Sequence, residues 1–183
     1  MFVDDIRKEK EFYNARVCRL DEFSGCKENV EFIIANGTPK HRKNIFDRLV
    51  SQNYQLTSLI DPTAIVSPRA HLGKGVIVLQ YSCINSNVVL MDNSLVHPHV
   101  SVGHDIVIGM HSIVCVTVRI GGNTIIGDET FLGEGAIIRD HLRIGSNAIV
   151  SMGAVVYRNV PDGVIVMGHP ARVIQKNTDG DVY

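Results

Sequence analysis

Histidine is the residue type best suited to move a proton or bind a metal near neutral pH. The chain has eight: His41, His71, His97, His99, His104, His111, His141 and His169. His104 is followed directly by Asp105. A carboxylate beside an imidazole can fix its tautomer and raise its basicity, so this pair can serve as a general base. Asp105 fits a plain turn residue equally well.

A six-residue repeat from Ile60 to Pro161 sets the places of these side chains. Its first position is aliphatic in all seventeen hexads: Ile60, Val66, Leu72, Val78, Ile84, Leu90, Val96, Val102, Ile108, Val114, Ile120, Ile126, Leu132, Ile138, Ile144, Val150 and Val156. Its fifth position is mostly small or β-branched, which indicates a narrow interior. Short strands that coil with three hexads per turn would make between five and six coils.

The fourth hexad position carries residue types that tolerate a positive φ. They are Gly75, Asn87, Asn93, His99, Asp105, His111, Asn123, Gly135, His141, Asn147, Gly153 and Asn159. We therefore expect a tight corner there, and the histidines at this position fit a turn role. His104 alone stands at the third position, which we expect to face outward at a corner.

The segments that flank the repeat predict two smaller parts. Residues 30–35 predict a buried strand, and Thr38 as N-cap before Pro39 predicts a helix that ends near Asn53. We therefore expect a small α/β domain over 1–59, the coil over 60–161, and a C-terminal strand and tail over 162–183.

Composition narrows the classes of function. The formal net charge of −1 argues against a nucleic-acid-binding surface. Cys18, Cys26, Cys83 and Cys115 lack metal-finger spacing, which favours reduced thiols in a cytoplasmic protein. No signal peptide is evident, and no apolar run approaches the roughly 18 residues of a membrane span.

Three features of the sequence make a resemblance specific. Residues 102–109 (VGHDIVIG), the ungapped hexads through Val156, and residues 168–172 (GHPAR) resemble the sugar acetyltransferases of the sialic acid O-acetyltransferase and UDP-4-amino-sugar N-acetyltransferase family. The resemblance implies a mainly β fold, a left-handed parallel β-helix of hexapeptide repeats that assembles as a homotrimer. It also implies a role in bacterial surface-glycan biosynthesis.

The resemblance implies a reaction as well. His104 would accept the proton of a sugar amine or hydroxyl as that group attacks the thioester of acetyl-CoA, and Asp105 would increase its basicity. Gly122, one coil later, would hold the thioester oxygen with its backbone N–H. A corner glycine that is merely convenient sterically is an equal alternative for Gly122.

Further positions follow from the same resemblance. Glu134 and Met152 match the groove for pantetheine between neighbouring copies, and Arg172 matches a CoA phosphate contact or a solvated charge. Ile113 stands near the CoA thiol end, where many relatives have a second histidine. His97 stands where a relative has asparagine, and it would either replace the missing polar contact to the acceptor or simply be exposed.

The region before the coil resembles the family's nucleotide-sugar-binding domain, which is Rossmann-like. Asp4, Asp5 and Gly37 would face the nucleotide-linked sugar. The family's opening strand and glycine-rich phosphate loop are not found, so this domain resembles a truncated form.

Two other functions compete with this reading. His99 and His104 are five residues apart, the spacing of two zinc ligands in γ-carbonic anhydrases, but no histidine stands near Thr63 as a third ligand. A catalytically silent trimeric coil is the other alternative. The sequence favours an acetyl-CoA-dependent sugar acetyltransferase, for which no metal is expected.

Overall fold

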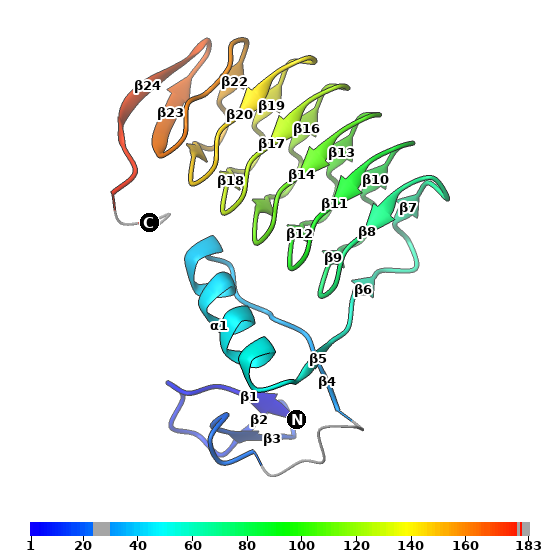
Figure 1. Ribbon diagram of the computed structural model, residues 1–183, viewed down its shortest axis with the longest axis vertical. Helices are drawn as coiled ribbons and strands as arrows, with labels where there is room; N and C mark the ends of the chain where they lie inside the picture. The colour runs from blue at the N-terminus through cyan, green and yellow to red at the C-terminus, as the bar shows by residue number, and fades with distance from the viewer. Residues whose placement is uncertain (24–29, 179, 181–183) are drawn as a thin grey trace. The chain divides into compact units, whose positions relative to one another are not determined.

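The computed structural model describes residues 1–23, 30–178 and 180 (Figure 1). By their internal contacts the residues form two compact units, Met1–Val30 and Glu31–Tyr183. The domain boundaries expected after residues 59 and 161 stay a prediction. Cys26 lies outside the described residues, whereas Cys18, Cys83 and Cys115 are free thiols.

The first unit is a small three-stranded sheet. Strand β3 (Ala15–Cys18) pairs in parallel with β1 (Phe2–Val3) and antiparallel with β2 (Glu11–Phe12). Tyr13 and Asn14 join β2 to β3, both with positive φ (45° and 57°), as the twist of a two-residue hairpin requires. The sequence does not predict this hairpin.

Helix α1 (Pro39–Ser51) begins and ends close to where the sequence predicts. Thr38 is the N-cap, as predicted, and has the extended conformation of that position, although its side chain makes no capping hydrogen bond. Strands β4 (Glu31–Phe32) and β5 (Gln55–Leu56) flank the helix and pair in parallel. The strand expected over 30–35 is therefore shorter, although Ile34 is buried.

The repeat folds into two-residue strands, each of which ends on the aliphatic first position of a hexad. Between residues 59 and 156, all of which the structure describes, they are β6 (Leu59–Ile60), β7 (Ile65–Val66), β8 (His71–Leu72), β9 (Ile77–Val78), β10 (Cys83–Ile84), β11 (Val89–Leu90), β12 (Leu95–Val96), β13 (Ser101–Val102), β14 (Val107–Ile108), β15 (Ile113–Val114), β16 (Arg119–Ile120), β17 (Ile125–Ile126), β18 (Phe131–Leu132), β19 (Ile137–Ile138), β20 (Arg143–Ile144), β21 (Ile149–Val150) and β22 (Val155–Val156).

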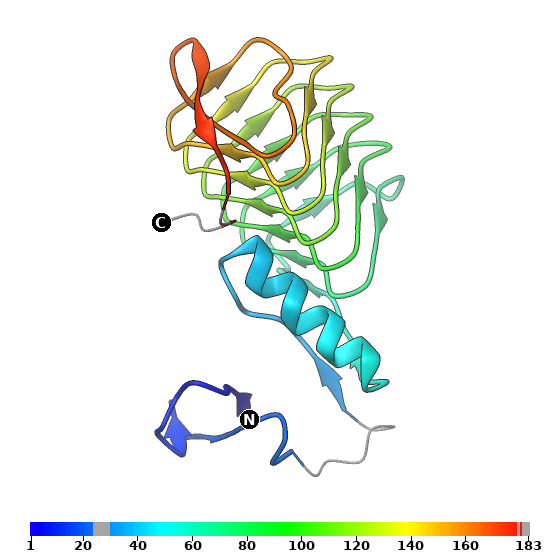
Figure 2. The ribbon, with the colours of Figure 1, turned by 60° about the vertical axis from the view of Figure 1, so that its left-hand side comes forward.

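These strands form three parallel sheets, the three walls of the coil (Figure 2). One wall runs β7-β10-β13-β16-β19-β22, a second β8-β11-β14-β17-β20, and the third β6-β9-β12-β15-β18-β21. Each strand from β6 to β19 pairs with the strand three places later, so facing residues such as Val102 and Ile120 are 18 apart. The expected period of three hexads per coil is confirmed.

Interior and corner positions match expectation except near the ends of the coil, where Ile60 and Leu72 are 36% exposed and Asn159 lacks a positive φ. The aliphatic first positions from Val78 to Val156 are at most 4% exposed and form one continuous core. The corner residues at the fourth position have positive φ: Asn87, Asn93, His99, Asp105, His111, Asn123, His141 and Asn147, all between 52° and 62°. Regular corners keep each coil in register with the next.

A buried arginine fastens α1 to the coil. Arg42 is 0% exposed, and its guanidinium donates to the backbone oxygens of Ile34 and Asn36 and to both the backbone and side-chain oxygens of Asn93. Asn93 donates in return to the Arg42 carbonyl oxygen. Burial lowers the pKa of Arg42 to about 10, which still leaves the guanidinium charged at neutral pH.

His111 extends this buried contact by one coil. Its Nδ1 lies 3.0 Å from the Asn93 amide nitrogen, and its ring packs edge-on against Phe46 of α1. Burial lowers the pKa of His111, so the neutral imidazole accepts the Asn93 N–H. His111 is therefore a docking residue for the helix as well as a turn residue.

A hairpin closes the C-terminal end of the coil. Strand β23 (Val164–Gly168) pairs in parallel with β21 and antiparallel with β24 (Ala171–Lys176). The chain then returns along the coil, where the Asn177 side chain donates to the backbone and side-chain oxygens of Asn147.

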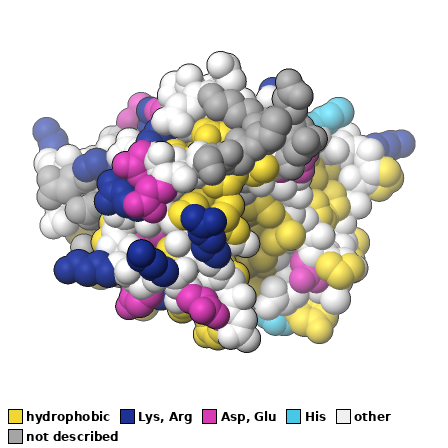
Figure 3. Space-filling model, turned by 90° about the horizontal axis from the view of Figure 1, so that it is seen from below, with side chains coloured by type: hydrophobic (Ala, Val, Ile, Leu, Met, Phe, Trp, Pro, Cys, Tyr) yellow, Lys and Arg dark blue, Asp and Glu magenta, His cyan; other side chains and the backbone are white. Residues whose placement is uncertain are grey.

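The molecular surface carries charges of both signs. On the face shown in Figure 3, lysine and arginine side chains lie among acidic ones, beside an area of hydrophobic side chains. This intermixing agrees with the near-zero net charge. In the described part of the chain, no helix combines the length and apolar character that a bilayer crossing requires.

Candidate active site

His104 and Asp105 form a direct pair at the corner between β13 and β14. The His104 Nδ1 lies 2.7 Å from one oxygen of the Asp105 carboxylate, and both side chains are largely exposed. Neighbouring residues in an extended strand would point to opposite faces, but the positive φ of Asp105 (54°) bends the chain so that the two converge.

Asp105 is held by both of its carboxylate oxygens. The second oxygen accepts a hydrogen bond of 2.9 Å from the Asn87 side-chain amide, one coil earlier. The hydrogen bonds from Asn87 and then from His104 lower the pKa of Asp105. The ionised carboxylate can only accept, so the His104 Nδ1 donates and the Nε2 of the neutral ring carries the free lone pair.

The His104 ring stands directly over Gly122. A Cβ on Gly122 would lie 2.8 Å from the His104 Nε2 and 2.9 Å from its Cε1, so only glycine leaves room for this ring position. Within residues 1–23, 30–178 and 180, no acceptor bonds the Gly122 N–H. Gly122, whose N–H is a free backbone donor, thus lies next to the unprotonated ring nitrogen.

A second group of expected site residues lies on the corner before β13, at the other edge of the same wall. Glu134 and Met152 are exposed there, Met152 by 72%. His97 is half-buried; burial lowers its pKa, Arg42 lowers it further, and Glu134 opposes both. In a single chain, therefore, Glu134, Met152 and His97 lie at a different corner from His104.

Ile113 and Cys115 are buried side chains near the corner that carries His97. Ile113 is 0% exposed within a hydrophobic cluster on the outer side of its wall, so its side chain is not presented at the surface of a single chain. Burial raises the pKa of the Cys115 thiol to about 12, and this thiol is therefore protonated and unreactive at neutral pH.

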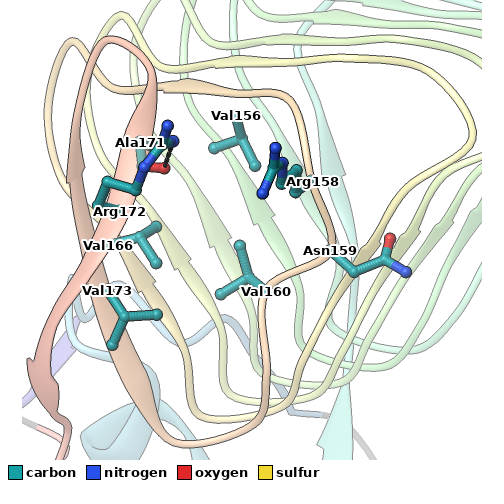
Figure 4. A pocket seen from close by; sticks show the side chains of 8 residues that line it. All are labelled: Val156, Arg158, Asn159, Val160, Val166, Ala171, Arg172 and Val173. Carbon is teal, nitrogen blue, oxygen red and sulfur yellow. Dashed lines mark hydrogen bonds between the residues drawn. The ribbon is translucent and has the colours of Figure 1, made fainter.

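Arg172 borders a shallow pocket of ≈150 Å³ at the C-terminal end. Figure 4 shows Arg158 and Arg172 on different segments that line this pocket, together with the apolar side chains of Val156, Val160 and Val166. Arg172 donates to the Ala171 carbonyl oxygen and is otherwise exposed. Two guanidinium groups at one pocket suit an anionic group.

The expected sugar-binding residues at the N-terminal end have mainly local partners. Asp4 accepts the backbone N–H groups of Ile6 and Arg7, which lower its pKa. Asp5 accepts the N–H of Leu20. Gly37, in the second unit, is exposed with open space at its Cβ position. Their assignment to a nucleotide sugar stays a prediction.

The histidines considered as zinc ligands have other surroundings. The His99 ring stacks on Tyr81 at 5.2 Å, and His104 is engaged by Asp105. Among the described residues of this one chain, no three His, Cys, Asp or Glu side chains are grouped as a metal site.

Comparison with known proteins places the chain in a family. A model of bacterial transferase hexapeptide (six repeats) matches residues 123–158. The acetyltransferase domain of PglB from Neisseria gonorrhoeae FA1090 is 31% identical, with a TM-score of 0.90 over 94% of this chain and 85% of that one. This chain belongs to the hexapeptide-repeat sugar acetyltransferases. Its coil is accordingly a left-handed parallel β-helix, and the protein is an acyltransferase.

Other solved sugar acetyltransferases have the same fold. WeeI from Acinetobacter baumannii AYE is 28% identical over 94% of this chain and 84% of its own, with a TM-score of 0.89. PerB from Caulobacter crescentus, solved with CoA and GDP-perosamine, is 28% identical over 80% of this chain and 72% of its own, with a TM-score of 0.73. The PglB domain has also been solved with acetyl coenzyme A. No curated protein sequence matches this chain.

Proposed function

We propose that this acetyltransferase moves the acetyl group of acetyl-CoA to the amino group of a nucleotide-linked sugar. The observation that carries the proposal is the His104–Asp105 pair, whose free Nε2 lies beside the unbonded N–H of Gly122. The PglB domain with acetyl coenzyme A and PerB with GDP-perosamine support the choice of substrates. The reaction would take place in the cytoplasm, on a precursor of a bacterial surface glycan.

The proposed chemistry is acyl transfer with general base catalysis. The sugar nitrogen attacks the thioester carbon while the His104 Nε2 takes one proton from it. The Gly122 N–H stabilises the negative charge that develops on the thioester oxygen. The carbon–sulfur bond then breaks, the proton passes from His104 to the sulfur, and CoA leaves as a thiol. Asp105 stabilises the imidazolium between these steps.

We further propose that the site is shared between copies of the chain. The corner with Glu134 and Met152 and the corner with His104 are separated by one wall, which spans six residues or at most about 20 Å. Pantetheine contacts and the base then come from adjacent protomers of a homotrimer. Arg172 would contact a phosphate of CoA, and Gly37 and His97 would contact the acceptor. The roles of Asp4 and Asp5 toward a nucleotide stay a prediction.

Calorimetry with acetyl-CoA, followed by mass spectrometry of amino-sugar nucleotides incubated with enzyme and acetyl-CoA, tests the proposed function. We expect saturable binding and one added acetyl group on the acceptor. Binding of acetyl-CoA without transfer to any amino-sugar acceptor would contradict the substrate assignment, and the absence of binding would contradict the whole proposal.

Gly122→Ala is expected to lower kcat by about 100-fold, because the new Cβ would push the His104 ring from its place and a shift of about 1 Å can cost this much. The three nearest atoms to that Cβ all belong to the ring, so the melting temperature should hardly change. Steady-state kinetics and thermal melts on the same sample measure kcat and the melting temperature. Wild-type kcat would show that the ring position is irrelevant.

Mixed trimers test the shared site. His104→Ala and Met152→Trp, which should block the pantetheine groove, are each expected to be inactive alone. Co-refolding them in equal amounts should restore about a quarter of wild-type activity, because random assembly unites two intact halves at one site in four. If activity is not restored, the base and the pantetheine groove of one site belong to the same chain. If Met152→Trp is active by itself, Met152 does not line the groove.

A further inference from the structure

Asn87 contacts the candidate catalytic pair from the preceding coil. Its side-chain nitrogen donates to one oxygen of Asp105 at 2.9 Å, while His104 occupies the other oxygen at 2.7 Å. Each oxygen of the Asp105 carboxylate therefore has one hydrogen-bond partner. The backbone is held from the same coil, because the Asp105 N–H donates to the Ser86 carbonyl oxygen.

The corner position alone does not explain this contact. Asparagine at a positive φ is common because its short polar side chain tolerates the left-handed region. Asn123, in the same row of corners one coil after Asp105, has the same conformation (φ 55° against 58° for Asn87). Across the described residues, however, its side chain makes no hydrogen bond. Only Asn87 of these two reaches the carboxylate.

Exposure makes such an anchor necessary. The Asp105 side chain is 46% exposed and the His104 side chain 63% exposed, so neither is fixed by packing. A solvated carboxylate with one partner can rotate away from the imidazole, whereas a second hydrogen bond restricts that rotation. We infer that Asn87 is a positioning residue that holds Asp105 where it can orient the His104 ring. This inference rests on the proposed function.

Few charged groups surround Asp105, so a change in its pKa can be assigned to the loss of a single partner. The corner residues on either side of it carry no charged groups: Ser86, Asn87, Gly122 and Asn123. His104 is therefore the titratable group that faces Asp105, and it acts by a hydrogen bond and by its charge. Loss of the neutral Asn87 amide should raise the pKa of Asp105 toward its ordinary value of 3.8.

Asn87→Gly and the matched control Asn123→Gly test the inference, since glycine accepts the positive φ at both corners. In Asn87→Gly we expect a higher Asp105 pKa by NMR titration and a kcat lower by about threefold to tenfold, with the KM for acetyl-CoA unchanged. Asn87→Asp should lower kcat further, because it sets a second carboxylate against Asp105. Asn123→Gly should match wild type in both measurements.

The outcomes separate this inference from the proposed function. An unchanged Asp105 pKa, or an unchanged kcat in Asn87→Gly, would overturn the positioning role while wild-type activity upholds the function. Equal losses in Asn87→Gly and Asn123→Gly would assign the effect to the turn and also overturn it. A wild-type enzyme without acetyl transfer would overturn both.

Discussion

His104→Ala is expected to lower kcat for acetyl transfer by about 10²- to 10⁴-fold, the usual contribution of a positioned general base. The side chain is exposed and, among the residues that the structure describes, bonds only Asp105, so the fold and its stability should be unaffected. Rates with saturating acetyl-CoA and acceptor, together with the melting temperature, measure the two effects separately.

His141→Ala is the matched control. His141 also stands at an exposed corner beside an acidic residue, with its Nε2 3.7 Å from Asp140, but it is two coils beyond Asp105 in the same row. Its loss should leave kcat within about twofold of wild type. A His104→Ala variant as active as His141→Ala would remove His104 from the mechanism.

Arg42→Met is expected to lower the free energy of unfolding by about 3–5 kcal/mol, because it leaves buried oxygens of Ile34 and Asn93 without donors. Methionine retains much of the buried volume, so lost hydrogen bonds rather than a cavity would cause the change. Urea unfolding followed by circular dichroism measures it.

Lys43→Ala provides the comparison on the next residue of α1. Lys43 pairs with Asp47 at 2.7 Å, but both side chains are well exposed, and such pairs contribute about 0–1 kcal/mol. A loss at Arg42→Met no larger than at Lys43→Ala would mean that the buried network does not hold the helix to the coil.

The fold of the coil could be predicted because the same environment recurs in every hexad. Each aliphatic first position ends a strand, and a corner residue such as Asn93 has the positive φ that its type suggested. The small hairpin of the first unit was missed because Tyr13-Asn14 is a weak turn signal. The burial of Arg42 was also missed, because its partner Asn93 is 51 residues away and a helix arginine is ordinarily exposed.

The candidate site was predictable where it depends on the register. His104 and Asp105 are adjacent in sequence, and Gly122 follows His104 by one coil of 18 residues. Asn87 stands 18 residues before Asp105, so the same spacing could also have predicted that Asn87 contacts Asp105. Ile113 was judged by its place in the register alone, which does not reveal that its side chain is fully buried in a single chain.

The constant offset of 18 residues between facing strands limits how this protein can change in length. A gain or loss that is not a multiple of six would turn interior side chains outward in every later coil, and a multiple of six that is not a multiple of 18 would move every later strand to another wall. Helix α1 contacts the coil from Asn93 to His111, and the tail returns to Asn147. A whole coil added before Asn93 would separate the docking site of α1 from β6, where the chain that follows the helix enters the coil, so whole coils are exchanged with least disturbance between His111 and Asn147.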